Sequence, residues 1–395
     1  MTTNMQTRTR SGVQGCLVSI AIFLLAGLCF GQDVSSLADW TEFHRTNMLR
    51  WNPYENVLNV NNVGNLAVKW DDWASVGADA SPAVANGVVY VVAQFELGQY
   101  ALYALDASTG GELWWSAIGA YGESTPAVVN GVVYVGCAYN VCAFNASTGA
   151  TLWYYVTGNA VESSPAVANG VVYIGSNDGN VYALNAQTGA KLWSYTTGGS
   201  VESSPAVANG VVYVGSWDHN VYALNANTGA KLWSYTTGSV VISSPAVVNR
   251  VPYLGTVVYV GSYDGKVYAL NARTGAKLWS YTTGSSVMSS PAVANGVVYI
   301  ASYDHYVYAL NATNGAKLWS YDTGFDVSGS GSSPAVANRV VYVGSGDGNV
   351  YALNARSGAK LWAWPTNTSG VSSPAVVNGV VYAMGGTGIY AFGLP

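Results

Sequence analysis

The stretch Ser203–Gly238, SSPAVANGVVYVGSWDHNVYALNANTGAKLWSYTTG, decides the fold. Its four short runs SPAVA, VVYVGS, NVYALNA and AKLWSYT are rich in β-branched and aromatic residues, which is typical of strands. Asn209-Gly210 predicts a two-residue type I′ hairpin, because that turn needs positive φ at both positions. Pro205 stands at the start of the first run, where a missing ladder N–H costs least. We therefore expect one antiparallel sheet of four strands.

This unit recurs with a period near 40 residues, a spacing typical of propellers and solenoids. A strand-opening proline recurs eight times, at Pro82, Pro126, Pro165, Pro205, Pro245, Pro291, Pro334 and Pro374. A fourth-strand tryptophan also recurs eight times, at Trp70, Trp114, Trp153, Trp193, Trp233, Trp279, Trp319 and Trp362. Strands this short cannot close a core within one unit, so neighbouring sheets must stack face to face.

The offset between the two series predicts how the array closes. Trp70 precedes the first proline, so the repeats begin with a lone fourth strand, Leu66–Trp70, and end with three strands, Ser373–Phe392. Pairing these two pieces in one blade removes the open edges of an unclosed array. We predict an all-β, closed propeller of eight four-stranded antiparallel blades.

Three segments follow from this reading: a signal peptide at 1–31, an irregular lead-in at 32–65 and the propeller at 66–395. Arg8 and Arg10 precede the apolar stretch Leu17–Leu28, which is short for a membrane span and suits a secretory signal. We expect an exported protein, periplasmic or extracellular, without a transmembrane span in its mature chain. An uncleaved anchor and a lipoprotein modified at Cys29 remain alternatives.

Charged residues make up only 9% of the chain, and the formal net charge is −5. Removing residues 1–31 takes away Arg8 and Arg10 but no acidic residue, which leaves the mature chain near −7. The sequence contains no basic stripe, so nucleic acid is not an expected partner. We expect a monomer.

Cys137 and Cys142 are the two cysteines outside the signal segment, in the hairpin sequence GCAYNVC. A Tyr139-Asn140 loop would set Ala138 opposite Val141 and Cys137 opposite Cys142, about 4.5 Å apart at Cα. That spacing allows a disulfide, and export permits one. Two buried thiols are the alternative, and no partner ligands suggest a metal site.

The segment ALNANTGAKLW at Ala223–Trp233 resembles the tryptophan-docking repeat of pyrroloquinoline-quinone (PQQ) propellers, A-x-[DN]-x-x-T-G-x-x-x-W. Related segments end at Trp114, Trp153, Trp193, Trp279, Trp319 and Trp362, so the resemblance covers essentially the whole mature chain. It implies that each indole packs on the backbone of an adjacent blade and is structural. The resembled family includes both quinoprotein dehydrogenases, which hold PQQ and Ca²⁺, and a non-catalytic lipoprotein propeller of outer-membrane assembly.

Several features of the dehydrogenases do not recur in this sequence. It has no adjacent cysteine pair, none of the long insertions that build a quinone pocket, and no catalytic Ser/His/Asp pattern. The histidines His44, His219 and His305 are scattered and predict no metal site. We therefore expect no catalytic residues and no cofactor, and keep a PQQ-dependent oxidoreductase or PQQ-binding protein, with Ca²⁺, as the alternative.

Variation between repeats points to one face. Residues 161–200 and 201–240 differ at six positions, four of which lie in the loop before the third strand or in the link between blades. Both connections leave the same face of a blade, and loop faces commonly bind partners. Candidate ligand-binding residues there are Trp217, His219, Tyr263, Tyr303 and His305. Unselected loop drift is the alternative, and for the neighbouring aspartates a turn-shaping role is favoured.

A second candidate set lies three residues before each strand-opening proline, near the channel mouth. Asp79, Glu123, Glu162 and Glu202 are acidic, and the next four blades carry Ile242, Met288, Gly331 and Val371. Pointed inward, these residues would make one half of the mouth negative and the other apolar, which would suit a cation or an amine. Capping of loop N–H groups is the alternative. The sequence thus favours a non-catalytic propeller that recognises a protein, peptide or small ligand.

Overall fold

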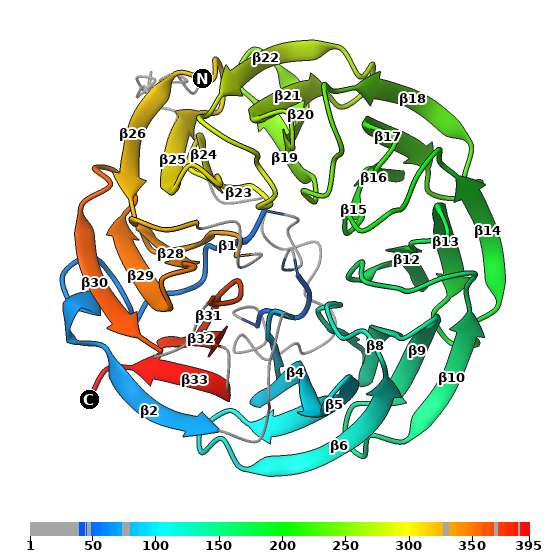
Figure 1. The fold of residues 1–395 in the computed structure, drawn as a ribbon, viewed down its shortest axis with the longest axis horizontal. Coiled ribbons are helices and arrows are strands. Elements are labelled where there is room, and N and C mark those ends of the chain that lie inside the picture. Colours follow the sequence, from blue (N-terminus) through cyan, green and yellow to red (C-terminus); the bar gives the residue numbers. More distant parts are fainter. Residues whose placement is uncertain are drawn as a thin grey trace, which may run out of the picture.

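The computed structural model describes residues 39–43, 45, 49–72, 80–326, 332–366, 370–385 and 388–395. They form eight antiparallel sheets arranged as a closed wheel around a central axis (Figure 1). The fold is the predicted eight-bladed β-propeller. The signal segment 1–31 and Asp79 lie outside the described residues. Within them, no helix is long and apolar enough to cross a membrane.

Each blade is numbered here in chain order, with its innermost strand first. Blade 1 comprises β3 (Ala83–Ala85), β4 (Val88–Glu96), β5 (Gln99–Asp106) and β6 (Glu112–Gly119), and blade 2 comprises β7 (Ala127–Val129), β8 (Val132–Cys137), β9 (Asn140–Asn145) and β10 (Thr151–Val156). Blade 3 comprises β11 (Ala166–Ala168), β12 (Val171–Gly175), β13 (Asn180–Asn185) and β14 (Lys191–Thr196), and blade 4 comprises β15 (Ala206–Ala208), β16 (Val211–Gly215), β17 (Asn220–Asn225) and β18 (Lys231–Thr236).

Blade 5 comprises β19 (Ala246–Val251), β20 (Gly255–Ser262), β21 (Lys266–Asn271) and β22 (Lys277–Thr282), and blade 6 comprises β23 (Ala292–Ala294), β24 (Val297–Ala301), β25 (Tyr306–Asn311) and β26 (Lys317–Asp322). Blade 7 comprises β27 (Ala335–Ala337), β28 (Val340–Gly344), β29 (Asn349–Asn354) and β30 (Lys360–Pro365), and blade 8 comprises β31 (Ala375–Val377), β32 (Val380–Gly385), β33 (Gly388–Gly393) and β2 (Ala67–Asp72). The last blade is therefore composite. Its outer strand β2 comes from the N-terminal side and pairs with β33, with Trp70 opposite Ala391.

Blade 4 shows why the repeat folds this way. Asn209 and Gly210 have φ of 52° and 74°, the two positive values of the predicted type I′ turn. The innermost strand is limited to Ala206–Ala208, shorter than the SPAVA run. The preceding residues cannot extend this ladder, because Pro205 has no N–H and the Ser204 N–H donates to Ser244 Oγ of the next blade.

The eight tryptophans lock each blade to its neighbour. Each indole Nε1–H donates to a backbone carbonyl of the following blade at 2.8–3.0 Å, and Trp362 donates to Leu66 O across the closure. Seven of the rings also lie against the glycine of the following N-x-x-[TSN]-G turn or its counterpart. At Gly275, for example, an added Cβ would come within 2.7 Å of Trp233. The structural role implied by the resemblance is therefore seen at all eight seams.

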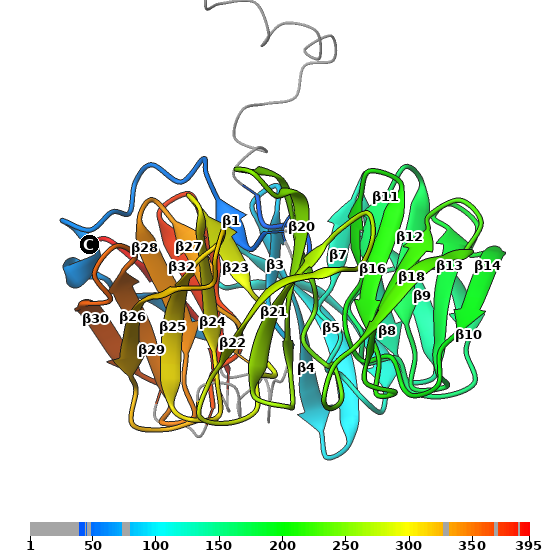
Figure 2. The same ribbon diagram turned by 90° about the horizontal axis from the view of Figure 1, so that it is seen from above.

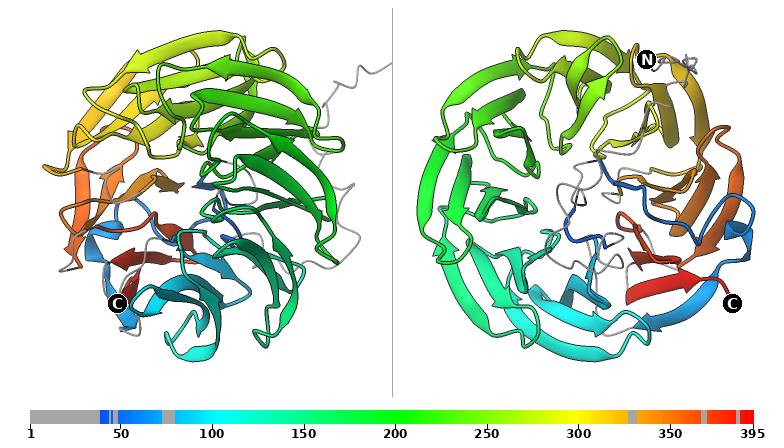
Figure 3. Two further views of the ribbon diagram at one scale, coloured as in Figure 1. Left: turned by 45° about the vertical axis from the view of Figure 1, so that its right-hand side comes forward. Right: turned by 180° about the vertical axis from the view of Figure 1, so that it is seen from behind.

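The described residues of the lead-in, 39–43, 45 and 49–65, lie along part of one face of the wheel and at the central channel (Figures 1 and 3). It includes the short strand β1 (Trp51–Asn52), parallel to β27, and the 3-10 turn η2 (Val63–Asn65). Further backbone hydrogen bonds join it to the innermost strands: Trp40 pairs with Val84, and Leu49 O accepts from the Val293 N–H. The lead-in thus connects blades on opposite sides of the axis.

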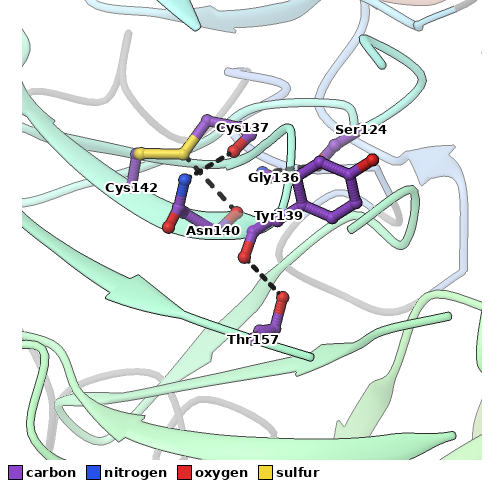
Figure 4. The surroundings of a disulfide bond; sticks show 7 residues. All are labelled: Ser124, Gly136, Cys137, Tyr139, Asn140, Cys142 and Thr157. Carbon is purple, nitrogen blue, oxygen red and sulfur yellow. Dashed lines mark hydrogen bonds between the residues drawn. A yellow bond between two sulfur atoms is a disulfide. The ribbon is translucent and has the colours of Figure 1, made fainter. Parts of the chain in front are cut away.

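The Cys137–Cys142 disulfide is present, with the two Cα atoms 6.0 Å apart (Figure 4). The predicted register of its hairpin is wrong: the turn lies one residue earlier, which shifts each partner on the first strand by two residues. Cys137 pairs with Asn140 and Cys142 with Val135, because Ala138 takes a positive φ of 52° and the turn is Ala138-Tyr139. The bridge therefore joins diagonal neighbours on one face of the hairpin instead of directly opposed residues.

Candidate functional site

The loops before the third strands and the links between blades gather on one face of the wheel, opposite the lead-in. Figure 2 shows the lead-in on one face and the long β4–β5 hairpin projecting from the other. On this loop face the channel opens into a cavity of about 380 Å³. We call it the cup. Its described lining is Phe43, Ser81, Glu123, Thr125, Glu162, Ser164, Glu202, Ser204, Ile242, Ser244, Met288, Ser290 and Ser333.

Consecutive blades give the cup an acidic side and an apolar side. Blades 2, 3 and 4 contribute Glu123, Glu162 and Glu202, whereas blades 5 and 6 contribute Ile242 and Met288. Each of these residues stands three positions before its strand-opening proline. Of the predicted mouth residues, Val371 is instead buried at 1% exposure. Asp79 and Gly331 lie in parts of the chain that are not described.

Glu202 is the carboxyl group most strongly affected by this arrangement. Burial and the charge of Glu162 raise its pKa to about 7, while hydrogen bonding from the Trp217 side chain acts in the opposite direction. Taking a carboxylate out of water disfavours its charged form, and a second carboxylate nearby adds to that cost. Glu202 therefore changes charge close to neutral pH. A cation in the cup would offset both effects and favour the ionised form.

Aromatic side chains stand beside the cup on the loops of blades 4 to 6. Trp217, 45% exposed, interacts with Glu202, and Tyr263 Oη donates to Met288 Sδ at 3.0 Å. Burial raises the pKa of Tyr263, with smaller contributions from Tyr303 and Glu202. The two sets of residues predicted separately, the mouth residues and the loop aromatics, are thus connected through Trp217–Glu202 and Tyr263–Met288.

The two candidate histidines are not part of this arrangement. His219 and His305 are exposed, have positive φ values of 74° and 76°, and do not line the cup. His305 Nε2 lies 3.2 Å from Asp326 Oδ1. Among the described residues, no group of three or more His, Cys, Asp or Glu is arranged to hold a metal ion.

The loop aspartates bind within the scaffold, in agreement with the turn-shaping role. Asp218 accepts hydrogen bonds from the Asn220 N–H at 3.0 Å, from Tyr222 Oη at 2.6 Å and from the Gly198 N–H at 2.7 Å. Gly198 belongs to the link that follows the preceding blade. The corresponding contacts recur at Asp178 and Asp264. These carboxylates therefore fix the loops that carry the aromatic side chains.

A ring of hydroxyl groups around the cup was missed in the sequence analysis. In blades 2 to 8, the Ser or Thr hydroxyl directly before the proline accepts a hydrogen bond from the backbone N–H of its counterpart in the preceding blade. The described bonds, 2.8–3.1 Å long, run in order from Ser81 through Thr125, Ser164, Ser204, Ser244, Ser290 and Ser333 to Ser373. The signal was the recurring Ser-Ser-Pro sequence itself, which was considered only for a catalytic Ser/His/Asp pattern.

The floor of the cup is Phe43 of the lead-in, held from below by Arg50. The Arg50 guanidinium lies 4.6 Å from the centre of the Phe43 ring, and its Nη1 donates to Phe43 O at 2.6 Å. The other donors reach Pro334 O, Ser333 O and Pro374 O. Arg50 is fully buried, and burial lowers its pKa to about 9. Its donors are thus directed at backbone carbonyls beneath the floor.

A family model described as outer membrane protein assembly factor BamB matches residues 56–162, 140–250 and 243–394. No curated protein matches the sequence. The quinohemoprotein alcohol dehydrogenase ADHIIG from Pseudomonas putida HK5 superposes with a TM-score of 0.79 at 19% identity, covering 91% of this chain and 80% of that one. BamB from Moraxella catarrhalis gives 0.68 at 20% identity, covering 83% and 99%. The computationally designed Ika8 protein gives 0.71 at 18% identity, covering 82% and 99%. At these identities the likeness to the three structures concerns the fold.

Proposed function

This chain belongs to the PQQ-like propeller family whose model is described as outer membrane protein assembly factor BamB, and we propose that it is an exported, non-catalytic binding protein whose cup recognises a positively charged group. That group would belong to a protein, a peptide or a small ligand. The observation that carries the proposal is the composition of the cup: carboxylates on one side, the apolar Ile242 and Met288 on the other, and the Phe43 ring at the floor.

Both sides suit a cation with some apolar character. Carboxylates attract the charge, and an aromatic face near the charge contributes about 0.5–2 kcal/mol for each well-placed ring. The rim supplies Trp217, Tyr263 and Tyr303, and the hydroxyl groups of the serine ring supply further polar contacts. Because the wheel and the lead-in fix these groups in place, little order has to be created on binding.

Export rests on the sequence of residues 1–31, which predicts a secretory signal. It is consistent with the disulfide, since such bonds persist mainly in oxidising compartments. Mass spectrometry of the secreted protein should give a mature N-terminus near Gln32. Recovery of the intact chain with Met1 in the cytosol would contradict the export proposal.

The second candidate function is a PQQ-dependent oxidoreductase or a PQQ-binding protein, favoured by the fold shared with ADHIIG. The described lining of the cup does not fit this cofactor. PQQ carries three carboxylates, whereas the cup presents Glu123, Glu162 and Glu202, and the donors of Arg50 are directed at carbonyls below the floor. We therefore derive no reaction step through a quinone. A shifted quinone spectrum on mixing the protein with PQQ and Ca²⁺, with dye reduction by an alcohol, would favour this candidate instead.

The binding proposal is tested by titrating the purified protein with choline, a permanent cation, and with a lysine-rich peptide. Replacing Trp217, Tyr263 and Tyr303 together with Ala should lower the affinity on the order of tenfold, because the aromatic contacts are lost. Tyr253→Ala, in the exposed connection between β19 and β20, is the control and should bind like the wild type. Unchanged binding by the triple variant, with its thermal transition intact, would refute the role of the aromatic rim.

A further inference from the structure

The outer strand of each blade is an exposed sheet edge, and its eight copies form an internal comparison. Seven of them contain a charged residue: Lys69 in β2, Glu112 in β6, Lys191 in β14, Lys231 in β18, Lys277 in β22, Lys317 in β26 and Lys360 in β30. A charge on an edge strand discourages pairing with another chain. Strand β10, with the sequence Thr-Leu-Trp-Tyr-Tyr-Val, contains none.

The outward-facing side chains of β10 are also unusual. Leu152, Tyr154 and Val156 are 50%, 66% and 61% exposed. At the positions of Tyr154 and Val156, strand β14 carries Ser194 and Thr196, and β18 carries Ser234 and Thr236. Blade 2 therefore presents an apolar stripe where blades 3 to 5 present Ser and Thr. In blade 1, β6 has exposed Leu113 and Trp115 at the first two positions of this stripe, next to the charged Glu112. Single exposed apolar residues are common, but three in a row on an unpaired edge mark an interaction site.

We propose that β10 pairs antiparallel with β10 of a second copy of this chain. A two-fold axis through Tyr154 sets Tyr154 opposite Tyr154 and Leu152 opposite Val156, all on the same face of the joined sheet. Aromatic and aliphatic pairs of this kind stabilise antiparallel strands by about 0.2–1 kcal/mol each. The two second blades would then form one continuous sheet that crosses the dimer interface.

The charge pattern favours a second copy as the occupant. In a two-fold pair every residue of β10 also faces a residue of β10, so the absence of charge from one strand removes it from both sides at once. The same operation on β14 would set Ser194 opposite Ser194 and Leu192 opposite Thr196, with Lys191 at each end. Among the eight outer strands, only β10 contains no charged residue, so only its self-pairing places no charge in the joined strands.

The pairing involves one short strand from each copy, so the association is expected to be weak and concentration-dependent. A stable interface needs on the order of 1,000 Å² or more of buried surface, whereas six residues of strand extend about 20 Å. This dimer is a departure from the monomer that the sequence suggests. The proposed dimer does not involve the cup, because the cup lies at the central channel and β10 lies at the outer edge of the wheel.

Sedimentation equilibrium of the full mature chain, with its disulfide intact, tests the dimer. The wild type should show a reversible monomer–dimer equilibrium between micromolar and millimolar concentration. Tyr154→Lys should weaken it by tenfold or more, while Ser194→Lys, the same substitution at the equivalent position of β14, should leave it unchanged. A wild type that stays monomeric throughout, or a dimer that tolerates Tyr154→Lys, would overturn the proposal.

Cross-linking tests the register independently of affinity. Because Tyr154 faces itself across the axis, Tyr154→Cys should form an intermolecular disulfide under mild oxidation, and Ser194→Cys should not. Circular dichroism shows that each variant is folded before it is compared. Equal cross-linking of the two variants would mean random collision and would contradict the proposed pairing.

Discussion

Carboxyl groups at different radii of the wheel have different electrostatic surroundings. In the loops, burial raises the pKa of Asp218, but hydrogen bonds from Tyr222 and from the Gly198 and Asn220 N–H groups outweigh burial, and the pKa lies below its usual value. Near the axis, Glu202 and Glu42 have few such donors, and burial dominates. The loop carboxylates are therefore stabilised in their charged form, and the axial carboxyls in their neutral form.

Glu42 gives a prediction for the pH dependence of stability. It lies in the lead-in, and burial raises its pKa to about 8, although it accepts a hydrogen bond from the Val167 N–H. Between pH 4.5 and 8 the native state keeps a proton that the unfolded state has released, so the free energy of unfolding should fall as pH rises. Glu42→Gln should reduce this fall and leave the part that comes from Glu202, and thermal unfolding between pH 5 and 8.5 would measure the difference. Parallel curves for variant and wild type would contradict the buried carboxyl.

Individual site residues were predictable where the repeat itself served as a comparison. Glu123, Glu162 and Glu202 break the pattern at one position of the repeat, and they line one cavity. The contact between Trp217 and Glu202 was not predictable, because it depends on how the loop of one blade bends toward the link that precedes the same blade. Phe43 and Arg50 belong to no repeat, so no internal comparison pointed to the floor of the cup.

At the scale of strands and turns, the blades are held together by a few recurring contacts. The fourth-strand tryptophans join successive blades near the outer edge of the wheel, and the ring of Ser and Thr hydroxyl groups joins them near the axis. In seven blades, the tyrosine of the second strand donates to the same backbone carbonyl as the tryptophan of its own blade, as Tyr213 and Trp233 both do to Ala272 O. Identical sequences therefore give nearly identical seams, and the scaffold stays constant while the loop face varies.

Substitutions at two glycines distinguish the cost of disturbing tryptophan docking from the cost of backbone strain. Gly275 and Gly210 have φ of 71° and 74°, but an added Cβ would meet the Trp233 ring at Gly275 and nothing within 4 Å at Gly210. Gly210→Ala should cost about 1–2 kcal/mol through the left-handed conformation alone. Gly275→Ala should cost more, toward the 3–5 kcal/mol of losing a buried tryptophan. Urea unfolding measures both, and equal losses would contradict the docking role of Trp233.

Turn conformations were predictable where the turn residues have a strong backbone preference. Asn-Gly pairs require the observed positive φ values, and the outcome follows from local sterics. The Ala138-Tyr139 turn was not predictable in this way, because an alanine with φ of 52° contradicts local preference. Its register reflects the pairing of the flanking strands β8 and β9, which tertiary packing sets.

At the scale of the whole molecule, the period, the offset between prolines and tryptophans, and the need to cover edges determine the closed wheel. Those constraints are arithmetic and steric, so the sequence alone was enough for the fold and for the composite blade of β2 and β33. The path of the lead-in was not predictable, because its described residues, 39–43, 45 and 49–65, belong to no repeat and contact several blades at once. That path is what makes the channel a cup with a floor.

The family and the solved structures leave a binding protein and a quinone enzyme as the two readings of this wheel, and the cup distinguishes between them. The central claim is that the cup recognises positive charge through Glu202. Calorimetric titration with choline at pH 8 and pH 6 tests it directly, since the charge of choline does not change with pH. The account predicts binding that weakens severalfold at pH 6, as Glu202, with its pKa of about 7, becomes protonated. It also predicts weak, pH-independent binding for Glu202→Gln. Absence of binding at both pH values, or wild-type affinity that ignores both pH and Glu202, would contradict the account.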